Sequence, residues 1–96
     1  MEAFKFTWDP AKNKVNRTLH KISFEEAVTV FYDPNGLLIH DPEHSEEEDR
    51  FILLGLSRRA KLLVVCHCYR EADEVVRIIS ARKADQDEEI QYIRRK

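Results

Sequence analysis

The stretch Val75–Ala84, with the sequence VVRIISARKA, decides how the rest of the chain is arranged. Its first six residues are mostly β-branched, which is typical of a β-strand, and after Ser80 the pattern becomes helical. Period-two alternation predicts two faces for this strand, with Val75, Arg77 and Ile79 on one and Val76, Ile78 and Ser80 on the other. A buried arginine is costly unless it is paired, so Arg77 is expected to bind a carboxylate of the protein or a phosphate.

The size of the chain predicts a single domain over residues 1–96. No apolar run is long enough to span a membrane, and residues 1–8 lack a signal-peptide pattern, so a cytoplasmic protein without membrane contact is expected. Cys66 and Cys68 lie two apart on a predicted strand, and their side chains therefore share a face. A disulfide between them would have poor geometry, which also fits a reducing compartment.

Charge is distributed unevenly along the chain, although the net charge is only −2. Residues 1–24 carry +3, residues 25–56 carry −8, and residues 57–96 carry +3. If the two basic ends meet on one face, they form a cationic patch that the net charge hides. The alternative is that the acidic middle segment simply neutralises the basic ends.

Hydrophobic periodicity and turn residues predict eight elements. The predicted strands cover residues 4–8, 37–40, 50–56, 61–69 and 75–80, and the predicted helices cover 10–20, 22–32 and 85–95. An acidic loop is expected at 41–49, and the strand at 61–69 is apolar on both faces, which indicates a central position. The order β-α-α-β-β-β-β-α with three short turns predicts an α+β fold, an antiparallel β-meander with the helices packed on one side.

Two of the helices have recognisable apolar patterns. In the first, a narrow apolar stripe recurs every four residues and consists of Ala11, Val15 and Leu19. In the second, Ser23 and Glu26 have the spacing of a capping box. A clear buried face follows at helical spacing, formed by Phe24, Ala27, Val28 and Phe31. On the first strand, Phe4, Phe6 and Trp8 share a face and are expected to meet the core.

Taken together, several segments resemble the BrnT family of ribonuclease toxins from type II toxin–antitoxin systems. They are FTWDPAKNKVNRTLHKISFEEAV, the Asp33-Pro34 turn, Glu48-Asp49-Arg50, Gly55 and RIISARKA with Tyr92 downstream. The resemblance implies a RelE-like fold and RNA cleavage in a prokaryotic cytoplasm. It also implies a BrnA-like ribbon-helix-helix antitoxin that neutralises the toxin and carries it to operator DNA. Glycines common in the family are missing at Leu19-His20-Lys21-Ile22 and at Glu71–Glu74.

RNA cleavage without a metal or other cofactor needs a base for the 2′-hydroxyl, an acid for the leaving oxygen, and cations on the phosphate. Through the resemblance, the candidate catalytic residues are His20, Arg50, Arg82 and Tyr92, and the candidate phosphate-binding residues are Lys12, Lys14, Arg77 and Lys83. Histidine suits proton transfer near neutral pH, and arginine grips phosphate through two parallel hydrogen bonds.

Each candidate also has a structural alternative. His20 could bond the free carbonyls of a helix end, and Arg50 could pair with an acid of its own loop. Arg82 could form a salt bridge with Asp85, Glu88 or Glu89, and Tyr92 could be packing.

The Cys66-His67-Cys68 segment raises a zinc hypothesis, but a flat strand points His67 away from both thiols, and the alternative is buried free thiols. An alternative function is a binding module that has lost cleavage and acts only as antitoxin partner and co-repressor.

Overall fold

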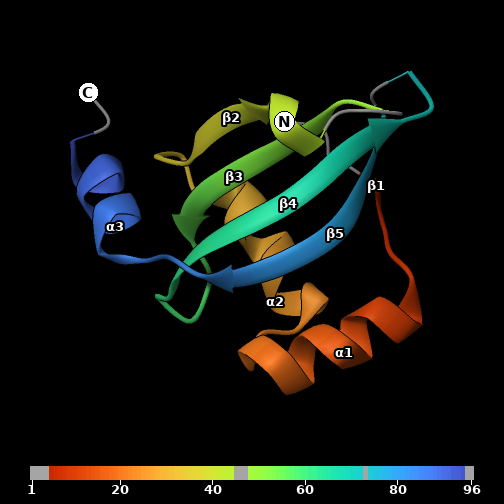
Figure 1. Ribbon diagram of the computed structural model, residues 1–96, viewed down its shortest axis with the longest axis horizontal. Coiled ribbons are helices and arrows are strands. Elements are labelled where there is room, and N and C mark those ends of the chain that lie inside the picture. Colours follow the sequence, from red (N-terminus) through yellow and green to blue (C-terminus); the bar gives the residue numbers. More distant parts are fainter. Residues whose placement is uncertain (1–4, 45–47, 73, 95–96) are drawn as a thin grey trace.

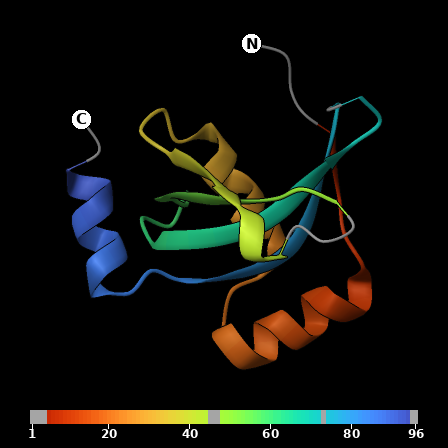
Figure 2. The same cartoon turned by 45° about the horizontal axis from the view of Figure 1, so that its top comes forward.

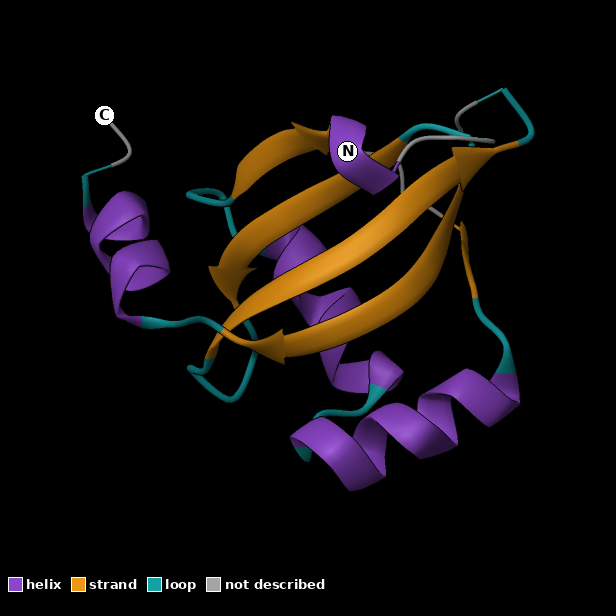
Figure 3. Ribbon diagram, viewed as in Figure 1, coloured by secondary structure: helices purple, strands orange, loops and turns teal. Residues whose placement is uncertain are grey.

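A computed structural model gives the structure of the chain and describes residues 5–44, 48–72 and 74–94 (Figure 1). The elements are β1 (Lys5–Thr7), α1 (Pro10–His20), α2 (Phe24–Thr29), η1 (Val30–Tyr32), β2 (Leu37–Asp41), η2 (Pro42–His44), β3 (Arg50–Leu56), β4 (Leu62–Arg70), β5 (Val75–Lys83) and α3 (Gln86–Ile93). The predicted α+β class is confirmed (Figure 3). The predictions for Phe4, for residues 45–47 of the acidic loop and for Arg95 fall outside the described residues.

The five strands form one mixed sheet in the order β1-β5-β4-β3-β2. Neighbours among β2–β5 are antiparallel, and β4 occupies the predicted central position. The prediction of a wholly antiparallel sheet is wrong, because β1 runs parallel to β5. A parallel pair needs a long connection, and here α1, α2 and three strands lie between the two partners.

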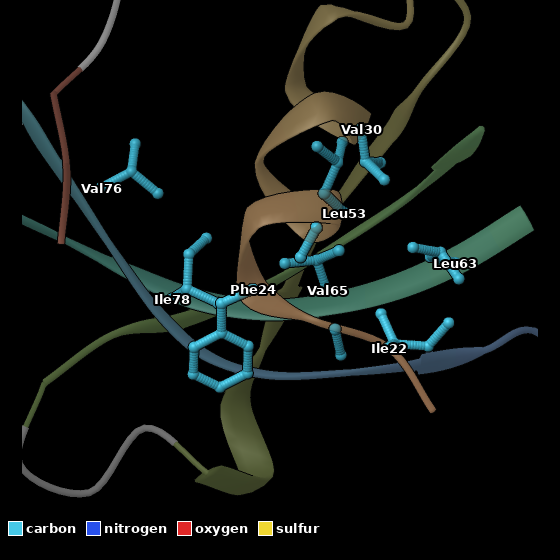
Figure 4. Close-up of a cluster of buried hydrophobic side chains, with 10 residues drawn as sticks. Ile22, Phe24, Val30, Leu53, Leu63, Val65, Val76 and Ile78 are labelled. Carbon is cyan, nitrogen blue, oxygen red and sulfur yellow. The ribbon is translucent and has the colours of Figure 1, made fainter. Parts of the chain in front are cut away.

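One face of the sheet is covered by α2 and the segment before it, and this covered face holds the main core (Figure 4). Phe24 and Ala27 of α2 are fully buried, as the helical spacing predicted. Ser23 caps the helix, because its hydroxyl accepts a hydrogen bond of 3.0 Å from the Glu26 N–H. The sheet contributes alternate residues to this core, namely Leu53, Leu63, Val65, Val76, Ile78 and Ala81.

Helix α1 packs with its polar side inward. Its buried residues are Asn13 and Asn16, whereas Val15 is 56% exposed and Leu19 is 69% exposed. The Asn16 side chain donates to the carbonyls of Ile22 and Ala81, both at 2.8 Å, and accepts from the Ala81 N–H at 3.1 Å. An apolar stripe ordinarily faces the core, but here hydrogen bonds between asparagine and backbone fix the helix and leave the stripe in solvent.

Helix α3 lies apart from α1 and α2, at the end of the sheet (Figures 1 and 2). Its Tyr92 packs on Leu54 and Val64, which point away from the covered face. The prediction that all helices pack on one side is therefore wrong for α3. The Tyr92 hydroxyl donates to Asp33 at 2.6 Å, and the same carboxylate oxygen accepts from the Leu56 N–H at 2.8 Å.

Strand β5 extends to Lys83, three residues beyond the predicted end. Its pairing with β4 shifts register near Cys66, where Ser80 opposes Cys66 and Ile78 opposes His67. Ile79 is therefore the extra residue of a β-bulge. The prediction that Ser80 shares a face with Ile78 is wrong, because the bulge rotates Ser80 to the side of Cys66.

Both places where family glycines are missing have a left-handed backbone. Lys21 has a φ of 60°, and Glu71 and Ala72 have φ values of 51° and 57°. Glycine adopts this conformation without steric cost, whereas this chain adopts it with side chains present. In the described ranges, no helix has the length and apolarity needed to cross a membrane.

Candidate active site on the open face of the sheet

The face of the sheet opposite α2, here called the open face, carries the predicted arginines. No α-helix crosses it in the view of Figure 1. Cys68 of β4 pairs with Arg50 of β3 on one side and with Arg77 of β5 on the other. Directly paired residues of antiparallel strands point to the same side. Because neighbouring strands are about 4.8 Å apart, the Cα atoms of the two arginines are roughly 10 Å apart.

Arg82 belongs to the same face but lies further along β5. It pairs with Val64, which is adjacent to Leu54 in the small cluster on the open face. Between Arg82 and Arg77 lie Cys66 and Ser80, which are directly paired across β4 and β5. Along the open face, Arg50 and Arg77 therefore form one row, and the polar pair Cys66 and Ser80 follows. Arg82 lies beyond that pair, toward the end of the sheet where α3 packs.

The three arginines differ in their partners. Within the described residues, the Arg77 side chain, which is half-buried, forms neither a hydrogen bond nor a salt bridge. Arg50 does have a partner, and it also lies close enough to Cys66 to favour the thiolate. Arg77 is thus the arginine of the open face whose guanidinium is available to an incoming anion.

Arg82 forms a bidentate pair with Glu88 of α3. The two hydrogen bonds, from Nη1 to Oε1 and from Nη2 to Oε2, measure 2.7 and 2.8 Å. The Arg82 guanidinium holds the pKa of Glu88 below its usual range, and Glu88 in turn raises the pKa of Arg82. Of the two readings of Arg82, the structure shows the salt bridge, in the fork geometry that a phosphate would also use.

His20 and Lys12 lie at the β5 edge of the open face. Both line a hollow of about 340 Å³ between α1 and β5, together with Val15, Ile79 and Ser80. His20 is the last residue of α1 and is exposed. The bulge at Ile79 turns Ser80 into this hollow. Ser80 therefore lies between His20 and the open face of the sheet.

The remaining candidates are Lys14, Lys83 and Tyr92. Lys14 lines a separate hollow on another side of α1. Lys83 is exposed and pairs with Leu63, on the covered side of the sheet. Tyr92 is buried against the sheet, and its hydroxyl is bound to Asp33. The structure therefore places Arg50, Arg77 and Arg82 on one sheet face and His20 and Lys12 at its β5 edge. Tyr92 packs on the same face beside Val64, the partner of Arg82, whereas Lys14 and Lys83 lie away from it.

The Cys66-His67-Cys68 segment divides between the two faces as the alternation predicted. Both thiols face the open side, where burial raises the pKa of each. His67 is fully buried on the covered side, its ring edge-on to Phe31 at 4.8 Å, and burial lowers its pKa. Among the described residues, no three His, Cys, Asp or Glu side chains gather in a geometry that could hold a metal ion.

Sequence reasoning missed Ser80 as a residue of the open face and Glu88 as the particular partner of Arg82. Nothing in the sequence marks the bulge that turns Ser80 outward. The acidic spacing of Asp85 and Glu88 is a capping-box signal, and both hydrogen bonds of that box are present at 2.8 Å. That signal could have singled out Glu88 among the three acids considered for Arg82.

Comparison with known proteins agrees with the sequence resemblance. Residues 8–88 match the family model described as "Ribonuclease toxin, BrnT, of type II toxin-antitoxin system". The crystal structure of the Brucella abortus ribonuclease toxin BrnT is similar in fold, with a TM-score of 0.58 and 21% identity, covering 88% of this chain and 100% of that one. No match was found among functionally curated proteins. Because the family model spans most of the residues that form the sheet and its helices, the chain belongs to the BrnT family of type II toxin–antitoxin ribonuclease toxins.

Proposed function

We propose that this protein is a RelE-like endoribonuclease that cleaves RNA on the open face of its sheet and thereby inhibits translation in the cytoplasm. The observation that carries the proposal is the position of Arg50, Arg77 and Arg82 on one sheet face that no α-helix crosses, with the Arg77 guanidinium unpaired within the described residues. Arginines held on adjacent strands are preorganised to receive a phosphate.

The proposed reaction takes its positive charge from arginine, so it needs no metal ion. A base removes the proton of the 2′-hydroxyl, the oxygen attacks phosphorus, and the bond to the 5′-oxygen breaks as an acid protonates that oxygen. Arg50 and Arg77 stabilise the extra charge on phosphate oxygens, and His20 serves in proton transfer from the β5 edge. Lys12 is the further phosphate contact at that edge. Arg82 also binds the substrate once a phosphate group takes the place of the Glu88 carboxylate on its guanidinium.

Lys83 and Tyr92 have smaller parts in this proposal. Lys83 adds positive potential at the end of β5 from the covered side. A catalytic role for Tyr92 requires its hydroxyl to leave Asp33, so in the conformation described it anchors α3.

The test is cleavage of a labelled RNA by purified protein with the substitution Arg77→Gln. Loss of one preorganised donor to a developing oxyanion costs about 10²–10³ in kcat. Arg94→Gln, an exposed arginine beyond α3, is the matched control and should cleave at the unmodified rate. Addition of a chelator should leave the rate unchanged. Equal activity of the Arg77 and Arg94 variants would refute the assignment of the open face.

A toxin of this type implies an antitoxin, and we propose a BrnA-like ribbon-helix-helix protein that also links the toxin to operator DNA. Its docking surface is the exposed apolar stripe of α1, with Val15 and Leu19 beside Ile79 in the small hollow. Basic residues flank the stripe, and α1 contains no acidic residue, so the fitting partner is an acidic amphipathic helix. Such a helix would also cover His20. Leu19→Glu should abolish capture of this antitoxin and preserve RNA cleavage.

The second candidate function is a binding module that has lost cleavage. The observation in its favour is the Arg82–Glu88 pair, which occupies the fork that would hold phosphate. Induced expression of the chain alone in a bacterial host separates the two functions. Growth arrest with loss of bulk RNA supports the ribonuclease, whereas normal growth with folded protein present supports the binding module.

A further inference from the structure

A second basic surface lies away from the open face, between α1, the start of α2 and the turn that joins β3 to β4. Two hollows of about 670 and 580 Å³ share Arg17 and Lys21 in their linings and are therefore neighbours on one basic surface. We call this the cationic groove and define it by its five basic residues, Lys14, Arg17, Lys21, Arg58 and Arg59. These come from two segments, since the last two belong to the turn after β3.

The groove has an excess of positive charge. Two carboxylates, Glu25 and Glu26, also line it, and both are already hydrogen-bonded. Asn13 donates to Glu25 at 2.9 Å, which is the main cause of the lowered pKa of Glu25, and Ser57 donates to Glu26 at 2.7 Å. By contrast, none of the five basic side chains forms a hydrogen bond or a salt bridge within the described residues. Arg17 also interacts electrostatically with Glu25. The five basic residues still exceed the two carboxylates of the lining by three.

The residues that line the groove are polar or charged, apart from Pro10. Protein partners gain most of their binding energy from aromatic and aliphatic anchors in apolar pockets. The hollow beside Val15 and Leu19 offers such anchors, and the cationic groove does not. Phosphate contacts instead use lysine, arginine and hydroxyl groups, and the groove supplies these together with Thr18, Ser23 and Thr29.

We propose that the cationic groove binds the sugar–phosphate backbone of single-stranded RNA, outside the segment that is cleaved. The inference rests on the proposed function in naming RNA as the ligand. The groove and the His20 hollow lie on two sides of α1, so one RNA strand that crosses this helix reaches both. Binding there is independent of sequence, because no base-reading pocket accompanies the cations.

The experiment measures binding of a fluorescent single-stranded RNA of 2′-O-methyl nucleotides, which cannot be cleaved, across a range of salt concentrations. Arg58→Gln should weaken binding several-fold and reduce the salt slope by about 0.7, the value for one phosphate contact on a single strand. Arg17→Gln with Arg58→Gln should reduce the slope by about 1.4. Arg94→Gln is the control with the same loss of charge and should leave the slope unchanged.

The outcomes separate this inference from the proposed function. If RNA is not cleaved but Arg58→Gln still weakens binding, the ribonuclease proposal fails and the groove stands. If RNA is cleaved but Arg58→Gln binds like the Arg94 control, the groove is refuted and the ribonuclease stands. In the cleavage assay, the groove variant should raise KM without lowering kcat. Tighter binding of a polyglutamate peptide than of RNA would also overturn the inference.

Discussion

The two faces of the sheet are built from alternate residues of the same strands, but they differ in chemistry. On the covered face, Val65 and Ile78 pack under Phe24 of α2. On the open face, the neighbouring residues are Cys66 and Arg77, and the latter has no partner within the described residues. One face therefore stabilises the fold and the other is free to vary for binding, so substitutions should affect stability on one and RNA cleavage on the other.

The largest effect is expected for Phe24→Ala on the covered face. Phe24 is fully buried, with 0% of its surface accessible to solvent. Its truncation should lower the free energy of unfolding by about 3–5 kcal/mol. Urea denaturation measures the loss. Ile39→Ala is the control, because Ile39 pairs with Ile52 on the open side of the sheet and is 41% exposed. A similar loss in both variants would contradict the division between faces.

The next effect is expected for Asn16→Ala, at the contact that joins α1 to the covered side of β5. The change leaves two carbonyls and one N–H without their partner. Unsatisfied buried groups should lower the free energy of unfolding by roughly 2–3 kcal/mol. Faster hydrogen exchange at the Ala81 amide should accompany the loss. Unchanged stability would show that water replaces the asparagine and that α1 is held by other contacts.

A smaller, pH-dependent effect is expected for Glu88→Gln on the open face. The pKa of Glu88 is lowered in the folded protein, chiefly by Arg82, so its ion pair adds stability above the ordinary carboxyl pKa of 4.5. That contribution disappears as the pH falls through the lowered folded value. Because 44% of the Arg82 side chain is exposed, the loss at pH 7 should stay under about 1 kcal/mol. Urea midpoints from pH 7 to pH 3 should converge, and a gap that widens in acid would be inconsistent with the pairing.

The smallest effect is expected for Leu19→Ser on α1. This side chain is 69% exposed, so its replacement removes little buried apolar surface. The free energy of unfolding should change by no more than about 0.5 kcal/mol. Thermal unfolding of this variant beside Asn16→Ala tests the orientation of the helix directly. A loss larger than that of the asparagine variant would mean that the apolar stripe, and not the asparagines, faces the core.

Much of the fold was predictable, because local pattern determined it. The strand Arg50–Leu56 and the buried face of α2 follow from alternation and helical spacing alone. Three features were not predictable, since each depends on residues distant in sequence. The parallel pairing of β1 requires the position of β5, the bulge at Ile79 requires the register with β4, and the inward side of α1 requires the Ala81 backbone that Asn16 binds.

The candidate site was predictable only in part. The resemblance supplied the residue types, and the arginines of β3 and β5 do share one face. Of the partners, the one of Arg82 had a signal in the sequence, the capping-box spacing of Asp85 and Glu88. Arg82 had three acids within reach, and the capping box of α3 selects Glu88. Tyr92 was a candidate for catalysis, with packing as the more usual role of such a tyrosine. Its bond to Asp33, 59 positions earlier, decides for packing in this conformation.

The Asn16–Ala81 contact, which spans 65 positions of the sequence, also has a consequence for synthesis of the protein. Ribosomes add about 5–20 residues per second, so roughly 3–13 seconds separate the two partners during translation. Throughout that interval α1 can coil locally, but the backbone groups that hold it against β5 do not yet exist. The first strand waits in the same way, since its neighbour in the sheet is the last strand made. Closure of the sheet, and with it the neighbourhood of His20 and Ser80, is therefore a late event in the life of each nascent chain.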